Sequence, residues 1–174
     1  MNVPPPHVRG AVRLSPAEPI LTAGTEHVYL HPGQMFAAAH RSAITTVLGS
    51  CVSVCLYDAR SGVGGANHYV HPHAAGVSPG EPLRVGESAI QALIDSVMSL
   101  GARRDRLVAK VYGGAHVLKA MTGERWHLGA ANVEVARTVL RAAHIPVQAM
   151  DVGGVRGRKL QFAIRDGSAW VKEI

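Results

Sequence analysis

Two strand-like stretches meet at the dipeptide Gly49-Ser50, and this junction constrains the fold more than any other feature of the chain. Residues 43–48 are apolar and β-branched, which predicts a buried strand. Residues 52–57 alternate in character, so that one face carries Val52, Val54 and Leu56 and the other carries Cys51, Ser53 and Cys55. The bend between the two strands therefore ends at a cysteine.

A return strand follows the alternating one. Residues 58–62 have the composition of a turn, and residues 63–70 then predict the second arm of a hairpin. Because the arms of a hairpin run side by side, His68 is expected to come back into the neighbourhood of Cys51.

The rest of the chain mixes strands and helices, which predicts an α+β fold with helices packed on a mixed, largely antiparallel sheet. Helical spacing runs over 85–100 and again after Asn132, which we expect to cap the second full helix. A short helix is expected over 116–121. The further predicted strands are 26–30, 107–112, 145–150, 159–165 and 169–172. The glycine pairs at 113–114 and 153–154 are interpreted as tight turns, because no phosphate-loop spacing follows them.

The length of 174 residues fits one domain with a real core. Residues 1–22 are rich in proline and are expected to be a flexible tail, which leaves 23–174 as a single domain. No apolar run approaches the ~20 residues needed to cross a bilayer, and the first residues lack the pattern of a secretory signal. We therefore expect a cytoplasmic protein.

The formal net charge of +6 leaves two interpretations. Aromatic residues make up only 5% of the chain, so stacking on single-stranded nucleic acid is poorly supported. The excess of basic residues is either an ordinary solvated face or a surface for an acidic protein partner.

Cys51 is the candidate nucleophile. A thiolate attacks, so a basic group must take the proton of the thiol. The Gly-Ser bend can expose the sulfur and point backbone amides at an oxyanion. The competing interpretation is that Cys51 is a small buried hydrophobe, which is the favoured interpretation for Cys55. A disulfide between them is excluded by distance, since four extended residues span roughly 13 Å.

His68 is the candidate base, although a histidine can equally be a hydrogen-bonded core residue. It follows Gly64-Gly65, where missing side chains would let a substrate or another backbone approach. The run of His68, His71 and His73 could also hold a metal, with Cys51 as a further ligand. No cofactor motif is present.

The chain from about residue 44 to its end resembles the chemoreceptor glutamine deamidase family, CheD. The resemblance rests on several blocks in one order: Leu48-Gly49-Ser50-Cys51-Val52, Val54-Cys55-Leu56-Tyr57-Asp58, Gly64-Gly65-Ala66-Asn67-His68, Lys110-Val111-Tyr112-Gly113-Gly114-Ala115, Leu128-Gly129, Asn132-Val133-Glu134, Asp151-Val152-Gly153-Gly154 and Gly157-Arg158.

The resemblance implies a three-layer α/β/β sandwich and a catalytic set of Cys51, His68 and Thr45. Gly49, Ser50 and Asn67 are the expected substrate-binding and oxyanion residues. The implied activity is that of a protein-glutamine glutaminase, which converts glutamines of methyl-accepting chemotaxis receptors to glutamate, with hydrolysis of glutamyl methyl esters as a side activity. No cofactor or metal is expected for this activity.

The implied partners are the receptors and a CheC-type phosphatase. Two rivals stay open from the sequence: a non-catalytic adaptor that binds these partners, and a metal-dependent hydrolase that uses the histidine run.

Overall fold

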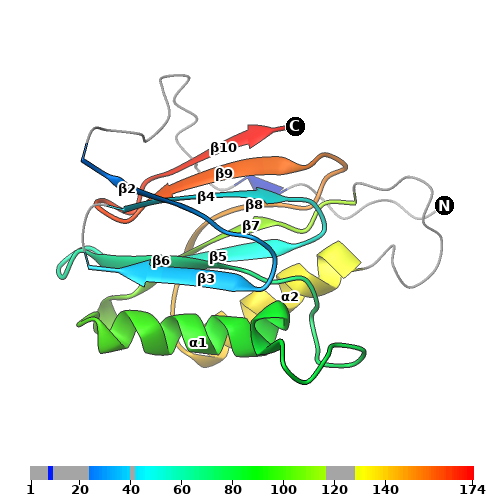
Figure 1. The fold of residues 1–174 in the computed structure, drawn as a ribbon, viewed down its shortest axis with the longest axis horizontal. Coiled ribbons are helices and arrows are strands. Elements are labelled where there is room, and N and C mark those ends of the chain that lie inside the picture. Colours follow the sequence, from blue (N-terminus) through cyan, green and yellow to red (C-terminus); the bar gives the residue numbers. More distant parts are fainter. Residues whose placement is uncertain (1–7, 10–23, 40–41, 117–127) are drawn as a thin grey trace.

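Two β-sheets and a pair of helices stack as three layers (Figure 1). The computed structural model describes residues 8–9, 24–39, 42–116 and 128–174. Within these ranges the four-stranded sheet forms one outer layer, the six-stranded sheet lies in the middle and the helices form the other outer layer. The predicted α+β class and the α/β/β layering are confirmed.

The middle sheet carries the hairpin predicted from the sequence. Its strands follow the order β1-β8-β7-β5-β6-β3 and are antiparallel except for the parallel pair β7 and β8. Their bounds are β1 Val8–Arg9, β3 Gln34–Ala38, β5 Val52–Asp58, β6 Val63–His68, β7 Val108–Gly113 and β8 Val147–Val152.

The outer sheet follows the order β10-β9-β4-β2, and only its β2–β4 pair is parallel. Its strands are β2 Glu26–Tyr29, β4 Ser42–Leu48, β9 Arg158–Ala163 and β10 Ala169–Glu173. The apolar core between the two sheets includes Ile44, Leu48, Cys55 and Phe162, all almost completely buried.

The helices cover the opposite face of the middle sheet. Helix α1 spans Gly86–Ser99 and α2 spans Leu128–Ala142, and short 3-10 turns cover Pro82–Arg84 (η1) and Arg104–Arg106 (η2). The buried stripe of α1 packs in a second core with Val52, Val54 and Leu56 of β5. The predicted division of β5 into two faces is therefore confirmed.

Strand β3 was not predicted. It pairs with β6, and Ala37 lies opposite Gly65. A Cβ on Gly65 would come within 2.5 Å of the Phe36 carbonyl oxygen, so this close pairing depends on the missing side chain. The alternation of β3 is weak, because Met35, Phe36 and Ala37 are all only partly buried.

Two other predictions, of a helix cap and of an N-terminal tail, differ from what the structure shows. The prediction that Asn132 caps a helix is wrong, because α2 begins at Leu128 and Asn132 is fully buried inside it. Within the expected N-terminal tail, Val8 and Arg9 pair with β8. The rest of that tail and most of the expected short helix lie outside the described residues. None of the helices in the described ranges is long and apolar enough to span a membrane.

Candidate active site

Cys51 and His68 lie on the same face of the β5–β6 hairpin. An isolated antiparallel bridge pairs Val52 with Tyr69, and the same register puts His68 opposite Ser53. Cys51 is two residues from Ser53 and so shares its face, diagonal to His68. This face looks toward the outer sheet, where the half-buried Cys51 packs against the inter-sheet core. The register therefore brings Cys51 and His68 onto one face of neighbouring strands.

One ring nitrogen of His68 is held by the outer sheet. Thr46 Oγ1 lies 2.8 Å from His68 Nδ1 and also 2.8 Å from the Leu30 carbonyl oxygen. That carbonyl accepts only, so the single hydroxyl proton goes to it, and Thr46 must accept from the ring. The arrangement assigns the proton to Nδ1 and leaves Nε2 with a free lone pair.

The other ring nitrogen is available for chemistry. His68 Nε2 is buried and has no hydrogen-bond partner among the described residues. A buried acceptor without a donor has a cost in free energy whether or not it serves a function. Nε2 therefore carries a free lone pair on the face of the hairpin that holds Cys51, and no described residue, Cys51 included, is hydrogen-bonded to it.

Burial keeps both groups neutral. It lowers the pKa of His68 from 6.5 to about 4, against a smaller opposing effect of the Leu30 carbonyl. It also raises the pKa of the Cys51 thiol, while Arg84 and the backbone amide of Cys51 pull that pKa down. The resting site thus holds a thiol and a neutral imidazole, so the thiolate must form during attack.

Three successive carbonyls anchor the bend at Cys51. The Gly49 oxygen accepts from the Ala115 N–H at 2.8 Å, and the Cys51 oxygen accepts from the Gly114 N–H at 2.8 Å. Between them, the Ser50 oxygen accepts from Asn132 Nδ2 at 3.0 Å. In a trans peptide the N–H points opposite to the C=O. The amides of Ser50 and Cys51 therefore point away from these anchors.

The backbone amide of Cys51 is one of the groups that hold the pKa of its own thiol down, against the larger effect of burial. An amide at this position can donate to an oxyanion that forms on a carbon bonded to that sulfur. This geometry suits the oxyanion role expected of the bend.

Asn132, the predicted helix cap, is a buried residue inside α2. Its Nδ2 donates to the carbonyl oxygens of Ser50 and Val70, at 3.0 and 2.9 Å, and so ties the Cys51 bend to the segment after His68. An asparagine among apolar residues of a helix was the available signal, because asparagine is a poor helix former without a partner.

Gly113 allows the bend to approach β7. Its φ is 107°, and a Cβ at this position would collide with the Cys51 carbonyl oxygen. Gly114 follows with φ 67° and donates its N–H to that same oxygen. The glycine pair at 113–114, interpreted as a tight turn, also sets the position of the nucleophile.

Two expected site residues, Asn67 and Thr45, do not lie on the strand faces that hold Cys51 and His68 together. Asn67 precedes His68 and so leaves β6 on the opposite face, where its Oδ1 accepts from the Val54 N–H at 2.9 Å. Thr45 is adjacent to Thr46 and leaves β4 on the outer face, so the hydrogen bond to the imidazole comes from Thr46 instead. The parity of β4 was the available signal, since Thr46 shares a face with the buried Ile44 and Leu48.

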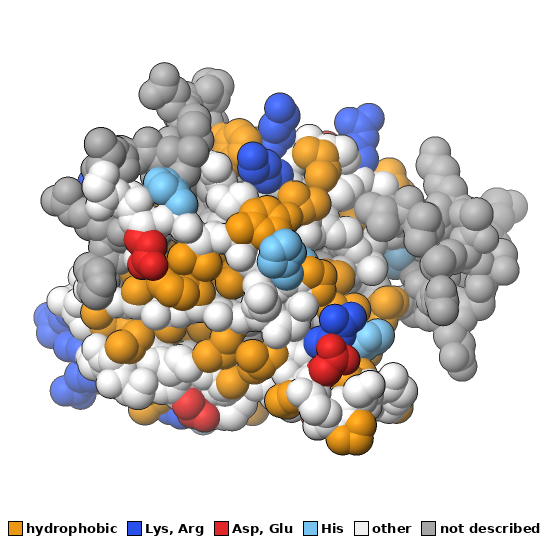
Figure 2. All heavy atoms as spheres, in the orientation of Figure 1, with side chains coloured by type: hydrophobic (Ala, Val, Ile, Leu, Met, Phe, Trp, Pro, Cys, Tyr) orange, Lys and Arg blue, Asp and Glu red, His pale blue; other side chains and the backbone are white. Residues whose placement is uncertain are grey.

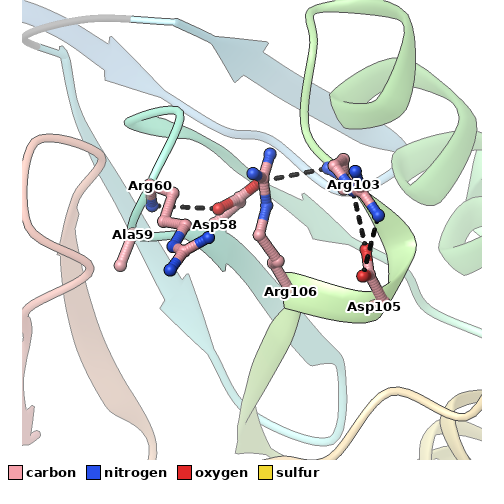
Figure 3. A pocket seen from close by; sticks show the side chains of 6 residues that line it. All are labelled: Asp58, Ala59, Arg60, Arg103, Asp105 and Arg106. Carbon is pink, nitrogen blue, oxygen red and sulfur yellow. Dashed lines mark hydrogen bonds and ion pairs between the residues drawn. The ribbon is translucent and has the colours of Figure 1, made fainter.

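A pocket of 390 Å³ lies at the other end of β5, beyond reach of Cys51 (Figure 3). At its base, Asp58 accepts hydrogen bonds from the Arg60 and Arg103 backbone amides and from Arg106 Nε. Burial raises the pKa of Asp58, but the hydrogen bonds from the Arg103 and Arg60 backbone amides and from Ser61 outweigh it and bring the value down to about 2. These contacts hold the turn after β5 against the segment that contains Arg103 and Arg106.

Among the described residues, no three His, Cys, Asp or Glu side chains gather closely enough to hold a metal ion. Figure 2 shows Lys and Arg side chains in several separate places on one face, not as one continuous basic stripe. Cys51 and His68, on one face of the β5–β6 hairpin, form the candidate site.

The comparisons with known proteins agree with one another. Residues 71–173 match the family model described as CheD chemotactic sensory transduction. A relative from Anaeromyxobacter dehalogenans, named "Probable chemoreceptor glutamine deamidase CheD 1", is 50% identical over 151 residues, covering 87% of this chain and 86% of the relative. A relative from Thiobacillus denitrificans, named "Probable chemoreceptor glutamine deamidase CheD", is 42% identical over 147 residues, covering 82% and 71%.

The family model begins after the candidate pair, but the alignment to the Anaeromyxobacter relative includes it. An aligned stretch of 151 residues in a chain of 174 must contain residues 24–151 wherever it begins. Among solved structures, a DUF152 protein of Neisseria meningitidis overlaps with a TM-score of 0.46 at 10% identity, covering 75% of this chain and 63% of that one. This overlap is too loose to carry an argument.

Proposed function

Because the chain belongs to the CheD family of chemotactic sensory transduction proteins, we propose that it is a protein-glutamine glutaminase, which deamidates glutamine side chains of methyl-accepting chemotaxis receptors through Cys51. The names of the relatives support the reaction and the kind of substrate. The free Nε2 of His68, on the face that carries Cys51, is the observation that supports the cysteine mechanism.

The first half of the reaction forms a thioester. His68 Nε2 takes the thiol proton as Cys51 Sγ attacks the carboxamide carbon, and the carbonyl oxygen becomes an oxyanion. The imidazolium then gives its proton to the amide nitrogen, the C–N bond breaks and ammonia leaves. The glutamyl group remains attached to Cys51.

The second half releases glutamate. His68 takes a proton from water as the water oxygen attacks the thioester carbon, and the C–S bond breaks. The thiolate recovers the proton from the ring, so the enzyme returns to its starting state. The net change is one amide and one water converted to one carboxylate and one ammonium ion.

The bend supplies the oxyanion donors in this proposal. The amides of Ser50 and Cys51 are directed away from the anchored carbonyls, and each well-placed donor of this kind contributes about 3 kcal/mol. Gly49 leaves the bend without a side chain. Asn67 is assigned a supporting role within the hairpin, and Thr46 takes the orienting role that the family resemblance implies for Thr45.

The proposal extends to partners, location and a side reaction. A glutamyl methyl ester has a better leaving group than an amide, so the same thiol would hydrolyse it. A CheC-type phosphatase is proposed as a regulator, on the resemblance alone. The free thiols of Cys51 and Cys55 fit a reducing cytoplasm.

Ammonia release tests this function. Purified protein is incubated with the cytoplasmic part of a chemoreceptor, and Cys51→Ala and Cys55→Ala are compared with the wild type. The proposal predicts ammonia from the wild type and Cys55→Ala but none from Cys51→Ala. Receptor binding without any ammonia would favour the adaptor, and activity that survives thiol alkylation but not a chelator would favour a metal hydrolase.

A further inference from the structure

Arg84 joins the loop after His68 to the catalytic hairpin. It ends the 3-10 turn η1, and its carbonyl oxygen accepts from the backbone amides of Val70 and His71, at 3.0 and 2.9 Å. These bonds hold the Arg84 backbone against the chain only two and three residues beyond His68.

The side chain of Arg84 crosses the backbone beside His68. Gly33 donates its N–H to the His68 carbonyl oxygen at 2.7 Å, and a Cβ on Gly33 would come within 2.7 Å of Arg84 Cγ. The stem of the arginine therefore lies directly on this glycine, whose φ of 83° also favours a residue without a side chain. A packed stem fixes the region in which the guanidinium can move.

The charge of Arg84 acts on both catalytic groups. Burial is the main influence on each pKa, but Arg84 lowers the pKa of the Cys51 thiol and that of His68 as well. Both effects have the sign expected of a nearby positive charge, which favours a thiolate and disfavours an imidazolium.

The Arg84 guanidinium is only weakly paired within the protein and can bind a further anionic group. Its ion pair with Glu81 is long, at 3.8 Å, and both side chains are substantially exposed, about one-third and one-half. A pair of this kind contributes little and exchanges readily. A guanidinium has five donors in a planar fork that matches a carboxylate.

We infer that Arg84 is a substrate-binding residue that selects glutamines flanked by carboxylates on the receptor. This inference rests on the packing of Arg84 beside His68 and on the weak ion pairing of the Arg84 guanidinium. It presupposes the proposed deamidation. A target glutamine enters toward Cys51, and a neighbouring glutamate or aspartate on the receptor surface pairs with the guanidinium. The same side chain then attracts the substrate and favours the thiolate.

A test with small alkylating reagents does not depend on deamidation. Iodoacetate is anionic and iodoacetamide is neutral, and both alkylate Cys51 through its thiolate. Arg84→Gln is expected to lower the ratio of the iodoacetate rate to the iodoacetamide rate about three- to tenfold, because a nearby cation attracts only the anion. Arg84→Lys should largely keep the ratio, and Arg104→Gln, an exposed arginine of η2, should not change it.

A second test measures substrate choice. Helical peptides carry one glutamine with either glutamate or lysine at the flanking helical positions, and kcat/KM is measured by ammonia release. The wild type is expected to prefer the acidic peptide, Arg84→Gln to lose most of that preference, and Arg84→Glu to reverse it. Arg104→Gln should behave as the wild type.

The two tests separate the possible failures. An unchanged reagent ratio in Arg84→Gln overturns the inference, whatever the peptides show. A changed ratio with equal losses on acidic and basic peptides overturns the substrate selection. If the wild type releases no ammonia from the peptides or from the receptor, the proposed function is overturned, and the substrate selection with it. In that case the ratio of the iodoacetate rate to the iodoacetamide rate still reports the charge beside Cys51.

Discussion

Thr46 Oγ1 and His68 Nδ1 lie 2.8 Å apart, and this contact between the two sheets determines which nitrogen of the imidazole carries the proton. Because the Thr46 hydroxyl donates to the Leu30 carbonyl, it accepts from the ring and leaves Nε2 free. In the proposed mechanism Thr46 has the role of the third member of other catalytic triads, which fixes the tautomer and the orientation of the base.

Thr46→Val is expected to lower kcat for deamidation about tenfold or more, because the ring loses its nearest Nδ1 partner and keeps only the 3.5 Å contact with the Leu30 carbonyl oxygen. Thr46→Ser should restore most of the activity, since it keeps the hydroxyl. Ammonia release under saturating receptor measures the effect. Thr45→Val is the matched control, and an equal loss in that variant would contradict the assignment of the role to Thr46.

The lowered pKa of His68 predicts how activity responds to acid. The ring must be neutral to accept the thiol proton, and its pKa is about 4 in the folded protein. The acid limb of kcat/KM should therefore fall near pH 4, well below the ordinary 6.5 for histidine. A limb near pH 6.5 would show that the free enzyme does not bury the ring as described.

The same shift predicts a loss of stability in acid. Between pH 6.5 and about 4 the unfolded chain binds a proton on His68 and the folded chain does not. The free energy of unfolding should therefore fall over this window, by on the order of 3 kcal/mol. Urea unfolding at several pH values measures it, and His68→Gln should lack this component. An identical pH dependence in that variant would contradict the prediction.

Asn132→Ala is expected to reduce both activity and stability. It leaves the carbonyls of Ser50 and Val70 without their shared donor, which has a cost of about 2–3 kcal/mol in a buried setting. The bend should loosen, so iodoacetamide should alkylate Cys51 at a changed rate. Glu134→Gln, on the exposed side of the same helix, is the control. Wild-type alkylation and deamidation in Asn132→Ala would rule out a positioning role.

Asp58→Asn should destabilise the fold without a specific effect on catalysis. Arg106 would lose its buried carboxylate partner, whose nearest contact is 3.0 Å, and the expected cost is about 2–4 kcal/mol. The wild type should also lose stability as pH falls below 4 toward 2, because the folded carboxyl stays charged until about pH 2. Chemical denaturation measures both effects. A fully folded variant with lost kcat would contradict the separation of this cluster from the site.

The sequence predicts most of the hairpin because alternation and turn composition are local signals. The division of β5 into two faces, and the approach of His68 to Cys51, follow from period-two geometry. Strand β3 could not be predicted in this way. Its pairing depends on a glycine of β6, whose contribution is the absence of a side chain.

The site details depend on contacts between distant elements. Thr46 of the outer sheet contacts His68 of the middle sheet. Asn132, in a helix more than eighty residues further along the chain, donates a hydrogen bond to the Cys51 bend. Strand parity in 43–48 favours Thr46 over Thr45, but the partner of either threonine is set by how the sheets stack. Local patterns carry no information on that packing.

The mass of receptor peptides, before and after treatment with the purified protein, tests the account most directly. Conversion of glutamine to glutamate adds ~1 Da, the mass change of an amide hydrolysed to an acid. We expect this gain at specific glutamines with the wild type and its absence with Cys51→Ala. Unchanged peptides with the wild type, or the same gain with Cys51→Ala, would contradict a deamidase that works through this thiol.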